Sequence, residues 1–225
     1  MSIRSKCTAL FASLVALAGA AMTAAPSALD TYSGDPFPLD TCPVSGEKLG
    51  KDAVVVVLSG MKDKNLDGTQ MKFCCQKCAD AFKADPAKFT EKYNEAVVKA
   101  SGEYALGTCL VMSDEGVDAS SKTVVVNNRV YKLCCKKCVA RFEKDPSKYV
   151  AAYEAAIIAK QKPGYKAAFC PISGEKIDAK STDVVIGGRL VRTCCAKCAA
   201  KAKADPKTTL SKVDALATAG NVEKK

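Results

Sequence analysis

Short apolar runs interrupted by pairs of turn residues are the clearest pattern along the chain. Two of them, "TVVVNNRVYKL" at 123–133 and "DVVIGGRLVRT" at 183–193, place apolar stretches on both sides of a two-residue turn. The pairs at 127–128 (Asn-Asn) and 187–188 (Gly-Gly) supply the positive backbone angles that such a turn needs. Each run therefore predicts a β-hairpin. A longer loop at 59–70 occupies the equivalent place in an earlier part of the chain.

A cluster of cysteines follows each predicted hairpin and opens a short helical pattern. Each of these helices is expected to end before an Asp-Pro pair, at 85–86, 145–146 and 205–206. Asp as the cap and Pro in the first turn then predict the start of a second helix. Aromatic residues at helical spacing are expected to pack the two helices together. These residues are Phe82, Phe89, Tyr93, Phe142, Tyr149 and Tyr153.

The third copy of this helix pair has smaller residues at the aromatic positions, which predicts looser packing, as is common in terminal repeats. The smaller residues are Ala202, Thr209 and Val213.

These elements form one unit that is repeated three times. The cysteine clusters begin at Cys74, Cys134 and Cys194, each sixty residues after the one before, and a single cysteine precedes each hairpin. The middle copy departs here, because "CLVMSDEGV" has lost the Pro and gained a residue relative to "CPVSGEKL" and "CPISGEKI". The three upstream cysteines are Cys42, Cys109 and Cys170.

The pattern predicts an α+β protein of three small tandem modules. Each module is expected to contain a knuckle-like turn at its first cysteine, a β-hairpin and two short helices, an arrangement similar to treble-clef zinc fingers. We place the three repeats at residues 38–99, 105–159 and 166–219.

Residues 1–25 have the features of a secretory signal peptide. Arg4 and Lys6 make a basic start, "CTALFASLVALAGAAM" is an apolar run, and small residues follow. The run is short and rich in alanine for a membrane span, and no later stretch reaches eighteen apolar residues. We therefore expect an exported protein, periplasmic or secreted, without stable membrane insertion, from which Cys7 is removed with the signal.

The composition shows why such small units need a cross-link or a bound metal to stabilise the fold. The 225 residues are 48% hydrophobic and 26% charged, as in folded proteins, but only 6% are aromatic and Trp is absent. Units of about 60 residues with few large side chains are marginally stable on their own. Without Cys7, twelve of the 13 cysteines remain, four in each repeat, and they are the obvious staples.

The net charge of +10 raises the question of an anionic partner. The lysines are spread along the helical segments and do not form one dense block, and an exported protein seldom meets nucleic acid. We expect no nucleic-acid partner, and the sequence leaves protein partners open.

The spacing of the cysteines within each repeat predicts a metal site. On a helix, residues three and four apart share a face, so Cys78 is expected to lie over Cys74 and Cys75. If the hairpin brings Cys42 against the helix start, four sulfurs can surround one tetrahedral ion at about 2.3 Å each. The same reasoning applies to each repeat. The predicted ligands are Cys42, Cys74, Cys75, Cys78, Cys109, Cys134, Cys135, Cys138, Cys170, Cys194, Cys195 and Cys198.

The chain contains no histidine, so any transition-metal site must use sulfur ligands. Soft ligands select thiophilic ions over Mg(II) or Ca(II); three thiolates suit Cu(I) and four suit Zn(II). We expect Zn(II) or Cu(I), about one ion per repeat. A structural zinc would contribute on the order of 10 kcal/mol to the folding of so small a module.

At these residues the chain resembles the YHS/TRASH group of heavy-metal-binding domains, in which an aromatic-C-x-x-x-C sequence is followed by an aromatic residue and "DP-x-x-Y". In the first copy, Cys74 and Cys78 match the cysteines, and Phe73, Phe82 and 85–89 match the flanks. The cysteine pairs of the other copies match too, and they are Cys134 with Cys138 and Cys194 with Cys198. The resemblance implies a role in metal sensing or trafficking, often of copper.

The first turn departs from that family's usual D-P-V-C-G-M. This chain has "CPVSGE" from Cys42, with cysteine in place of the Asp and Ser45 in place of the cysteine. The first ligand is therefore expected three positions earlier than in the family.

Three hypotheses for the function follow from these patterns. The first is an exported protein of three metal-binding modules that serves storage, trafficking or sequestration. The second takes the cysteines as disulfide staples or redox-active C-x-x-C pairs, because exported proteins meet oxidising conditions. The third is a structural or partner-binding array in which zinc is only a staple. We expect no enzyme, since histidine, a nucleophile elbow and a phosphate loop are all missing from the sequence.

Overall fold

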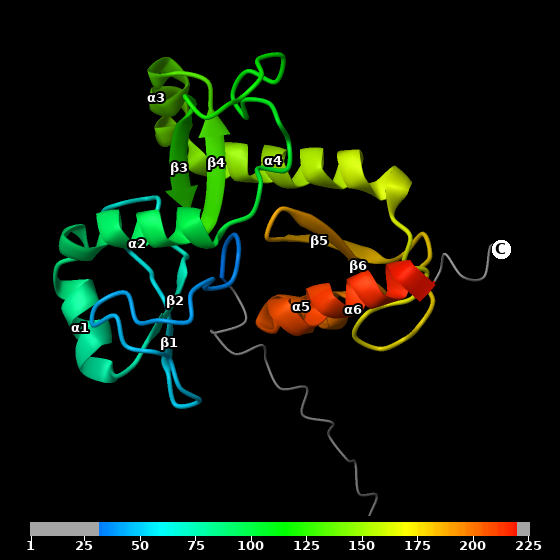
Figure 1. Ribbon diagram of the computed structural model, residues 1–225, viewed down its shortest axis with the longest axis horizontal. Helices are drawn as coiled ribbons and strands as arrows, with labels where there is room; N and C mark the ends of the chain where they lie inside the picture. The colour runs from blue at the N-terminus through cyan, green and yellow to red at the C-terminus, as the bar shows by residue number, and fades with distance from the viewer. Residues whose placement is uncertain (1–31, 220–225) are drawn as a thin grey trace, which may run out of the picture.

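The computed structural model describes residues 32–219 (Figure 1). Within these residues, six α-helices and three two-stranded antiparallel sheets form three successive units, which confirms the predicted α+β class and its repetition. The predicted signal peptide at 1–25 and Cys7 lie outside the described residues. In the described part of the chain, every helix is too short or too polar to cross a membrane.

Each unit has the order strand, strand, helix, helix. The first unit contains β1 (Val54–Val57), β2 (Gln70–Phe73), α1 (Gln76–Ala84) and α2 (Ala87–Ala100). The second contains β3 (Lys122–Val126), β4 (Arg129–Leu133), α3 (Lys136–Lys144) and α4 (Pro146–Gln161), and a short 3-10 helix, η2 (Lys162–Gly164), follows it. The third contains β5 (Thr182–Ile186), β6 (Arg189–Thr193), α5 (Ala196–Ala204) and α6 (Pro206–Ala219).

The two tight hairpins form where the turn residues predict them. Asn127 and Asn128 have φ of 48° and 63°, and Gly187 and Gly188 have φ of 56° and 73°. These left-handed conformations close β3 on β4 and β5 on β6 with Val126 opposite Arg129 in the first case. The longer loop of the first unit connects β1 and β2.

The helix starts after the Asp-Pro pairs follow the prediction in two of the three units. The Asp145 carboxylate accepts the N–H of Lys148 at 3.2 Å, and that of Asp205 accepts the N–H of Thr208 at 3.2 Å. Asp85 is an exception, because α2 begins at Ala87 without a side-chain cap. The predicted capping role of Asp85 is therefore wrong; its backbone N–H instead bonds to the last turn of α1.

The predicted contacts between paired helices are present as ring stacking. The ring centroids of Phe82 and Phe89 are 6.0 Å apart, and those of Phe142 and Tyr149 are 5.5 Å apart. Tyr153 turns instead toward the hairpin of its own unit, 5.1 Å from Tyr131. In the third unit the corresponding residues are buried but small, and the cluster of fully buried apolar side chains around them is the smallest of the three.

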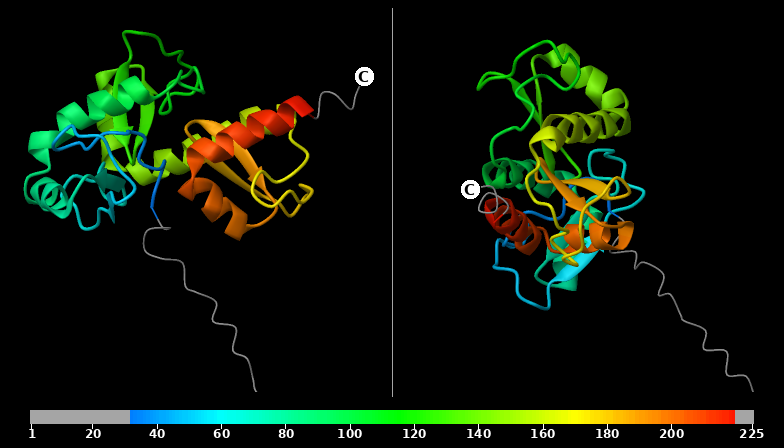
Figure 2. Two further views of the ribbon diagram at one scale, coloured as in Figure 1. Left: turned by 60° about the horizontal axis from the view of Figure 1, so that its bottom comes forward. Right: turned by 90° about the vertical axis from the view of Figure 1, so that its right-hand side faces the viewer.

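The three units pack head to tail. Helix α2 contacts the β3–β4 hairpin, and α4 lies along the β5–β6 hairpin, so each unit covers the hairpin of the next (Figures 1 and 2). The Nδ2 atom of Asn127 donates to the carbonyl of Asp67 at 2.7 Å, and that of Asn128 donates to the carbonyl of Gln70 at 2.7 Å. The hydroxyl of Tyr93 donates to Asn128 Oδ1. The turn of one hairpin is therefore buried in the unit before it.

The segment ahead of the first repeat also joins the units. The Asp35 carboxylate accepts two bonds from the Arg129 guanidinium and one from the backbone N–H of Gly187. The hydroxyl of Tyr32 donates to the carbonyl of Lys203 at 2.7 Å. Residues 32–37, which the sequence did not assign to any repeat, thus connect hairpins and helices of all three units.

Candidate metal centres

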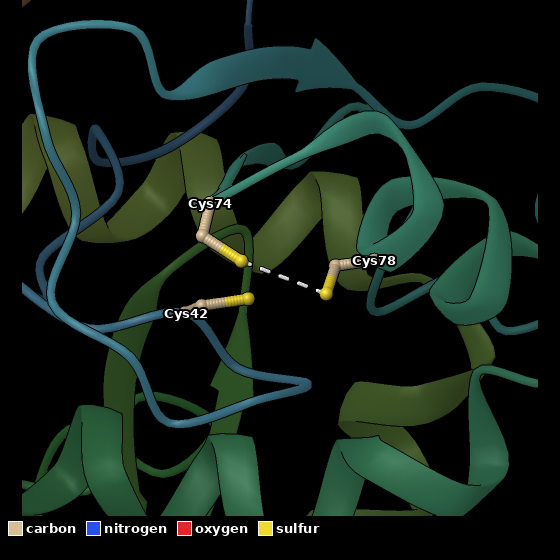
Figure 3. A group of neighbouring side chains, drawn as sticks. All are labelled: Cys42, Cys74 and Cys78. Carbon is tan, nitrogen blue, oxygen red and sulfur yellow. Dashed lines mark hydrogen bonds between the residues drawn. The ribbon is translucent and has the colours of Figure 1, made fainter.

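Three groups of cysteines come together, one in each unit. Within each group the three sulfurs lie within 4.8 Å of one another, close enough to hold a metal ion. Figure 3 shows the first group, in which the sulfurs of Cys42, Cys74 and Cys78 point toward a common centre. The other two groups are Cys109 with Cys134 and Cys138, and Cys170 with Cys194 and Cys198.

The first cysteine of each group is held in a tight turn before the hairpin. The N–H of Cys42 donates to the carbonyl of Glu47 at 2.7 Å, and its carbonyl accepts from Gly46 at 2.8 Å. Gly46 has φ of 78°, which a glycine adopts without strain. The third unit repeats this turn from Cys170 to Glu175.

In the second unit the turn is one residue longer. The N–H of Cys109 donates to the carbonyl of Glu115, six residues later, at 2.7 Å. The extra residue is therefore accommodated within the turn, and Cys109 still reaches its group.

The other two sulfurs of each group come from the start of a helix. Cys74 directly follows β2 and Cys78 lies in the first turn of α1, with their sulfurs 3.6 Å apart. The same separation is 3.5 Å between Cys134 and Cys138 and 3.6 Å for the third unit. A disulfide would require about 2.05 Å, and all twelve cysteines in the described residues are free thiols.

The fourth cysteine of each unit stands beside the group of three. Cys75, Cys135 and Cys195 are the residues just before α1, α3 and α5. Their sulfurs lie 3.9, 3.7 and 3.8 Å from a sulfur of the group, those of Cys74, Cys138 and Cys194. Four sulfurs at 2.3 Å from one tetrahedral ion would be about 3.8 Å apart. The fourth sulfur is therefore near enough to join an ion bound by the group, although it is not one of the three sulfurs that lie within 4.8 Å of one another.

Burial falls from the first cysteine to the fourth. Cys42, Cys109 and Cys170 are at most 2% exposed, whereas Cys75 and Cys195 are exposed. Each group thus has a buried anchor on the turn, and the groups of the first and third units have an exposed cysteine at the helix start.

Hydrogen bonds to the anchor sulfur favour its thiolate form. Burial raises the pKa of Cys42, but the hydroxyl and N–H of Ser45 and the N–H groups of Cys74 and Val44 outweigh it and lower the pKa to about 6. The pKa of Cys170 is also lowered to about 6 against its burial, by the N–H of Cys194 and by Ser173.

The cysteine inside the helix has the opposite tendency. Burial, followed by bonding to the sulfurs of Cys74 and Cys75, raises the pKa of Cys78 to about 12. A thiolate at Cys42 thus faces a protonated thiol at Cys78 in the metal-free chain. Because metals bind thiolates, an ion entering this group would displace the proton of Cys78.

Two serines belong to the sites, although the cysteine spacing did not indicate them. Ser45 Oγ lies 3.4 Å from Cys74 Sγ, and Ser173 Oγ lies 3.3 Å from Cys194 Sγ. The signal was the "SGEK" sequence that the first and third copies share. In the second copy, Met112 stands at the corresponding third position after the anchor, so that site lacks the hydroxyl.

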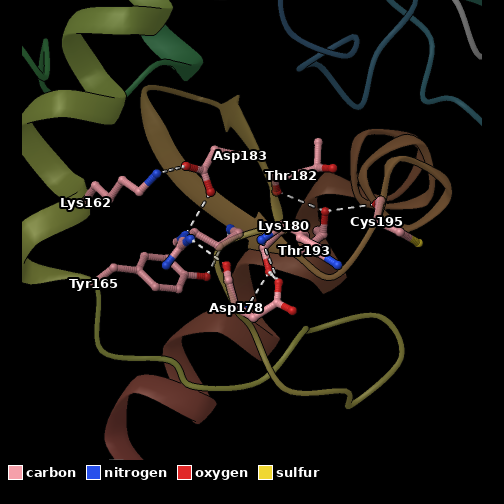
Figure 4. Close-up of polar contacts among 10 residues, drawn as sticks. Lys162, Tyr165, Asp178, Lys180, Thr182, Asp183, Thr193 and Cys195 are labelled. Atoms are coloured by element: carbon pink, nitrogen blue, oxygen red, sulfur yellow. Dashed lines mark hydrogen bonds and ion pairs between the residues drawn. The ribbon is translucent and has the colours of Figure 1, made fainter.

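Polar contacts fix the hairpin that leads to the third group (Figure 4). The hydroxyl of Thr193, a fully buried residue, bonds to the carbonyls of Thr182 and Cys195 at 3.1 and 3.2 Å. The Asp183 carboxylate accepts from Lys162 at 2.8 Å, and so ties the linker to β5. The Thr193 bonds hold the end of β6 next to the start of α5, where the cysteines lie.

Comparisons of the chain with protein-family models, with curated proteins and with solved structures found no match.

Proposed function

We propose that this is an exported heavy-metal-binding protein in which each unit holds one soft ion on its cysteines, for storage, trafficking or sequestration. The observation that carries the proposal is the threefold recurrence of three cysteine sulfurs within 4.8 Å of one another, drawn each time from a turn and a helix start. One accidental cluster of thiols would need little explanation. Three equivalent clusters in a chain without histidine favour a shared chemistry.

The ions are Zn(II) or Cu(I), about one per unit. Three thiolates suit Cu(I), and the addition of the fourth gives the four sulfurs that Zn(II) prefers. The fourth sulfurs are 3.7–3.9 Å from a member of each group, which is compatible with a four-sulfur shell. The turn, hairpin and helix of each unit are similar to a treble-clef finger, and the resemblance to YHS/TRASH domains supports the same role.

The role proposed is binding without catalysis, in the periplasm or outside the cell. Export rests on the signal-like residues 1–25, and the metal chemistry rests on sulfur alone. Nucleic acid is not part of the proposal.

Elemental analysis tests this function against the disulfide or redox alternative. The chain is purified from its exported fraction without added metal, bound Zn and Cu are measured, and thiols are titrated in denaturant after the metal is removed. About three ions with twelve reactive thiols support the proposal. Neither ion nor free thiol would instead support a disulfide framework.

A further inference from the structure

The fourth cysteine is placed differently in the middle unit and in the outer two. In the first and third units, Cys75 and Cys195 are exposed. The Cys75 sulfur lies 3.9 Å from Cys74 Sγ, and the Cys195 sulfur lies 3.8 Å from Cys194 Sγ. Those two neighbours are themselves only partly buried, so this side of each group is accessible from solvent.

In the second unit the fourth cysteine contacts the equivalent two cysteines of its cluster but is less exposed. Cys135 is half-buried, and its sulfur lies 3.7 Å from that of Cys138, which is 1% exposed. Cys135 also packs against the apolar core of its unit, as Cys75 and Cys195 do not. Met112, in the longer turn, packs against the same core. The sulfur of Cys135 is therefore less accessible to another molecule.

We propose that Cys75 and Cys195 are exchange ligands, an inference that rests on the proposed function. Through these cysteines the first and third units pass their ion to an acceptor that presents thiolates. The second unit retains its ion. Exchange of a thiophilic ion between proteins requires a sulfur that the acceptor can approach while the ion stays bound to the donor. A buried anchor and an exposed fourth sulfur provide these two properties in the outer units.

The exchange conserves bonds and charge. Where the ion is held by the group of three, the exposed Cys75 sulfur binds it as the neighbouring Cys74 sulfur leaves it, and a proton on Cys75 passes to Cys74. An acceptor thiolate then forms a metal–sulfur bond as the Cys75–metal bond breaks. One bond forms for each bond that breaks, and the metal keeps its oxidation state. If the acceptor sulfur arrives as a thiol, its proton passes to the displaced cysteine.

The kinetics of zinc transfer test this proposal. The full reduced chain is loaded with three equivalents of Zn(II) and mixed with an excess of a synthetic peptide that carries four cysteines as acceptor. We expect two ions to leave in a fast phase and one in a slow phase. Transfer of all three ions at a single rate would overturn the proposal.

Matched variants assign the phases. Cys75→Ser and Cys195→Ser should each move one ion from the fast to the slow phase, with a rate lowered by about 10- to 100-fold, the typical cost of losing a group next to a metal. Gln76→Ala, which changes the exposed residue next to Cys75 and removes no sulfur, should leave the fast phase unchanged. If Cys75→Ser leaves the rates unaltered, or abolishes zinc binding by the first unit, Cys75 is not an exchange ligand. A wild-type chain that binds neither Zn(II) nor Cu(I) would instead contradict the proposed function itself.

Discussion

The guanidinium of Arg129 and the carboxylate of Asp35 form a buried ion pair through two hydrogen bonds of 2.9 and 3.1 Å. Arg129 is 2% exposed and Asp35 is 6% exposed. The pair joins the segment ahead of the first repeat to β4 of the second unit, and the N–H of Gly187 extends it to the third. This segment and the second and third units are therefore connected by a buried ion pair.

Removal of Asp35 should destabilise the whole chain. Asp35→Ala leaves the buried Arg129 with fewer partners, and breaking such a pair costs about 3–5 kcal/mol in free energy of unfolding. Denaturation of the metal-loaded chain in urea measures the change. The exposed pair of Arg189 and Asp214 is the control, since Asp214→Ala should cost no more than about 1 kcal/mol. Equal effects of the two variants would show that the Asp35 pair does not join the units.

The two glycines of the third hairpin should respond differently to substitution. A Cβ atom on Gly188, at φ of 73°, would lie 3.1 Å from the Tyr153 hydroxyl, whereas one on Gly187 would meet no atom within 4 Å. Gly188→Ala should lower the free energy of unfolding by about 1–3 kcal/mol, the usual cost of a left-handed non-glycine residue, increased by crowding. Gly187→Asn should be nearly neutral, because Asn127 holds the same place in the second unit. Urea denaturation measures the loss of stability in both variants. A larger loss for Gly187→Asn than for Gly188→Ala would contradict the prediction.

The anchor thiol should give the metal-free chain a distinct pH dependence. The pKa of Cys42 falls from 9.0 to about 6 on folding, so its thiolate stabilises the fold fully above pH 9.0, and this contribution is lost as the pH falls toward 6. The raised pKa of Cys78 has the opposite effect on stability. Above pH 9.0 its thiol ionises in the unfolded chain before it does so in the folded chain, and the fold loses stability. The thiolate absorbance of the reduced chain should therefore rise near pH 6, and Cys42→Ser should reduce this rise.

Ser45→Ala provides the control for that titration. Loss of its hydroxyl removes one of the bonds that lower the pKa of Cys42, so the Cys42 step should move to higher pH while the Cys170 step near pH 6 stays. An unchanged titration in Ser45→Ala would show that the hydroxyl does not stabilise the thiolate.

Local signals explain how much of the fold could be predicted from the sequence. The hairpin turns at 127–128 and 187–188 and the helices after each cysteine cluster depend on backbone angles and side-chain spacing within a few residues. The predicted cap forms at Asp145 and Asp205 but not at Asp85, although all three Asp-Pro pairs end one helix and start another, so the pair alone does not determine the side-chain contact.

Contacts between units could not be predicted, because they join residues that are far apart in the chain. Asn128 carries an ordinary turn signal, yet its side chain bonds to Gln70 and Tyr93 of the unit before it. In the sites, the cysteine spacing indicated which sulfurs could converge. The difference between exposed Cys75 and half-buried Cys135 depends on packing around the longer turn at Cys109, which the spacing does not encode.

X-ray absorption spectroscopy of the metal bound to the isolated chain tests the central claim most directly, since it counts the atoms around the ion and identifies their elements. We expect a shell of three or four sulfurs at about 2.3 Å with no nitrogen or oxygen. We also expect Cys170→Ser to lower the ion content from about three ions per chain to about two. A shell dominated by oxygen or nitrogen would contradict a site built from the cysteines of a turn and a helix start.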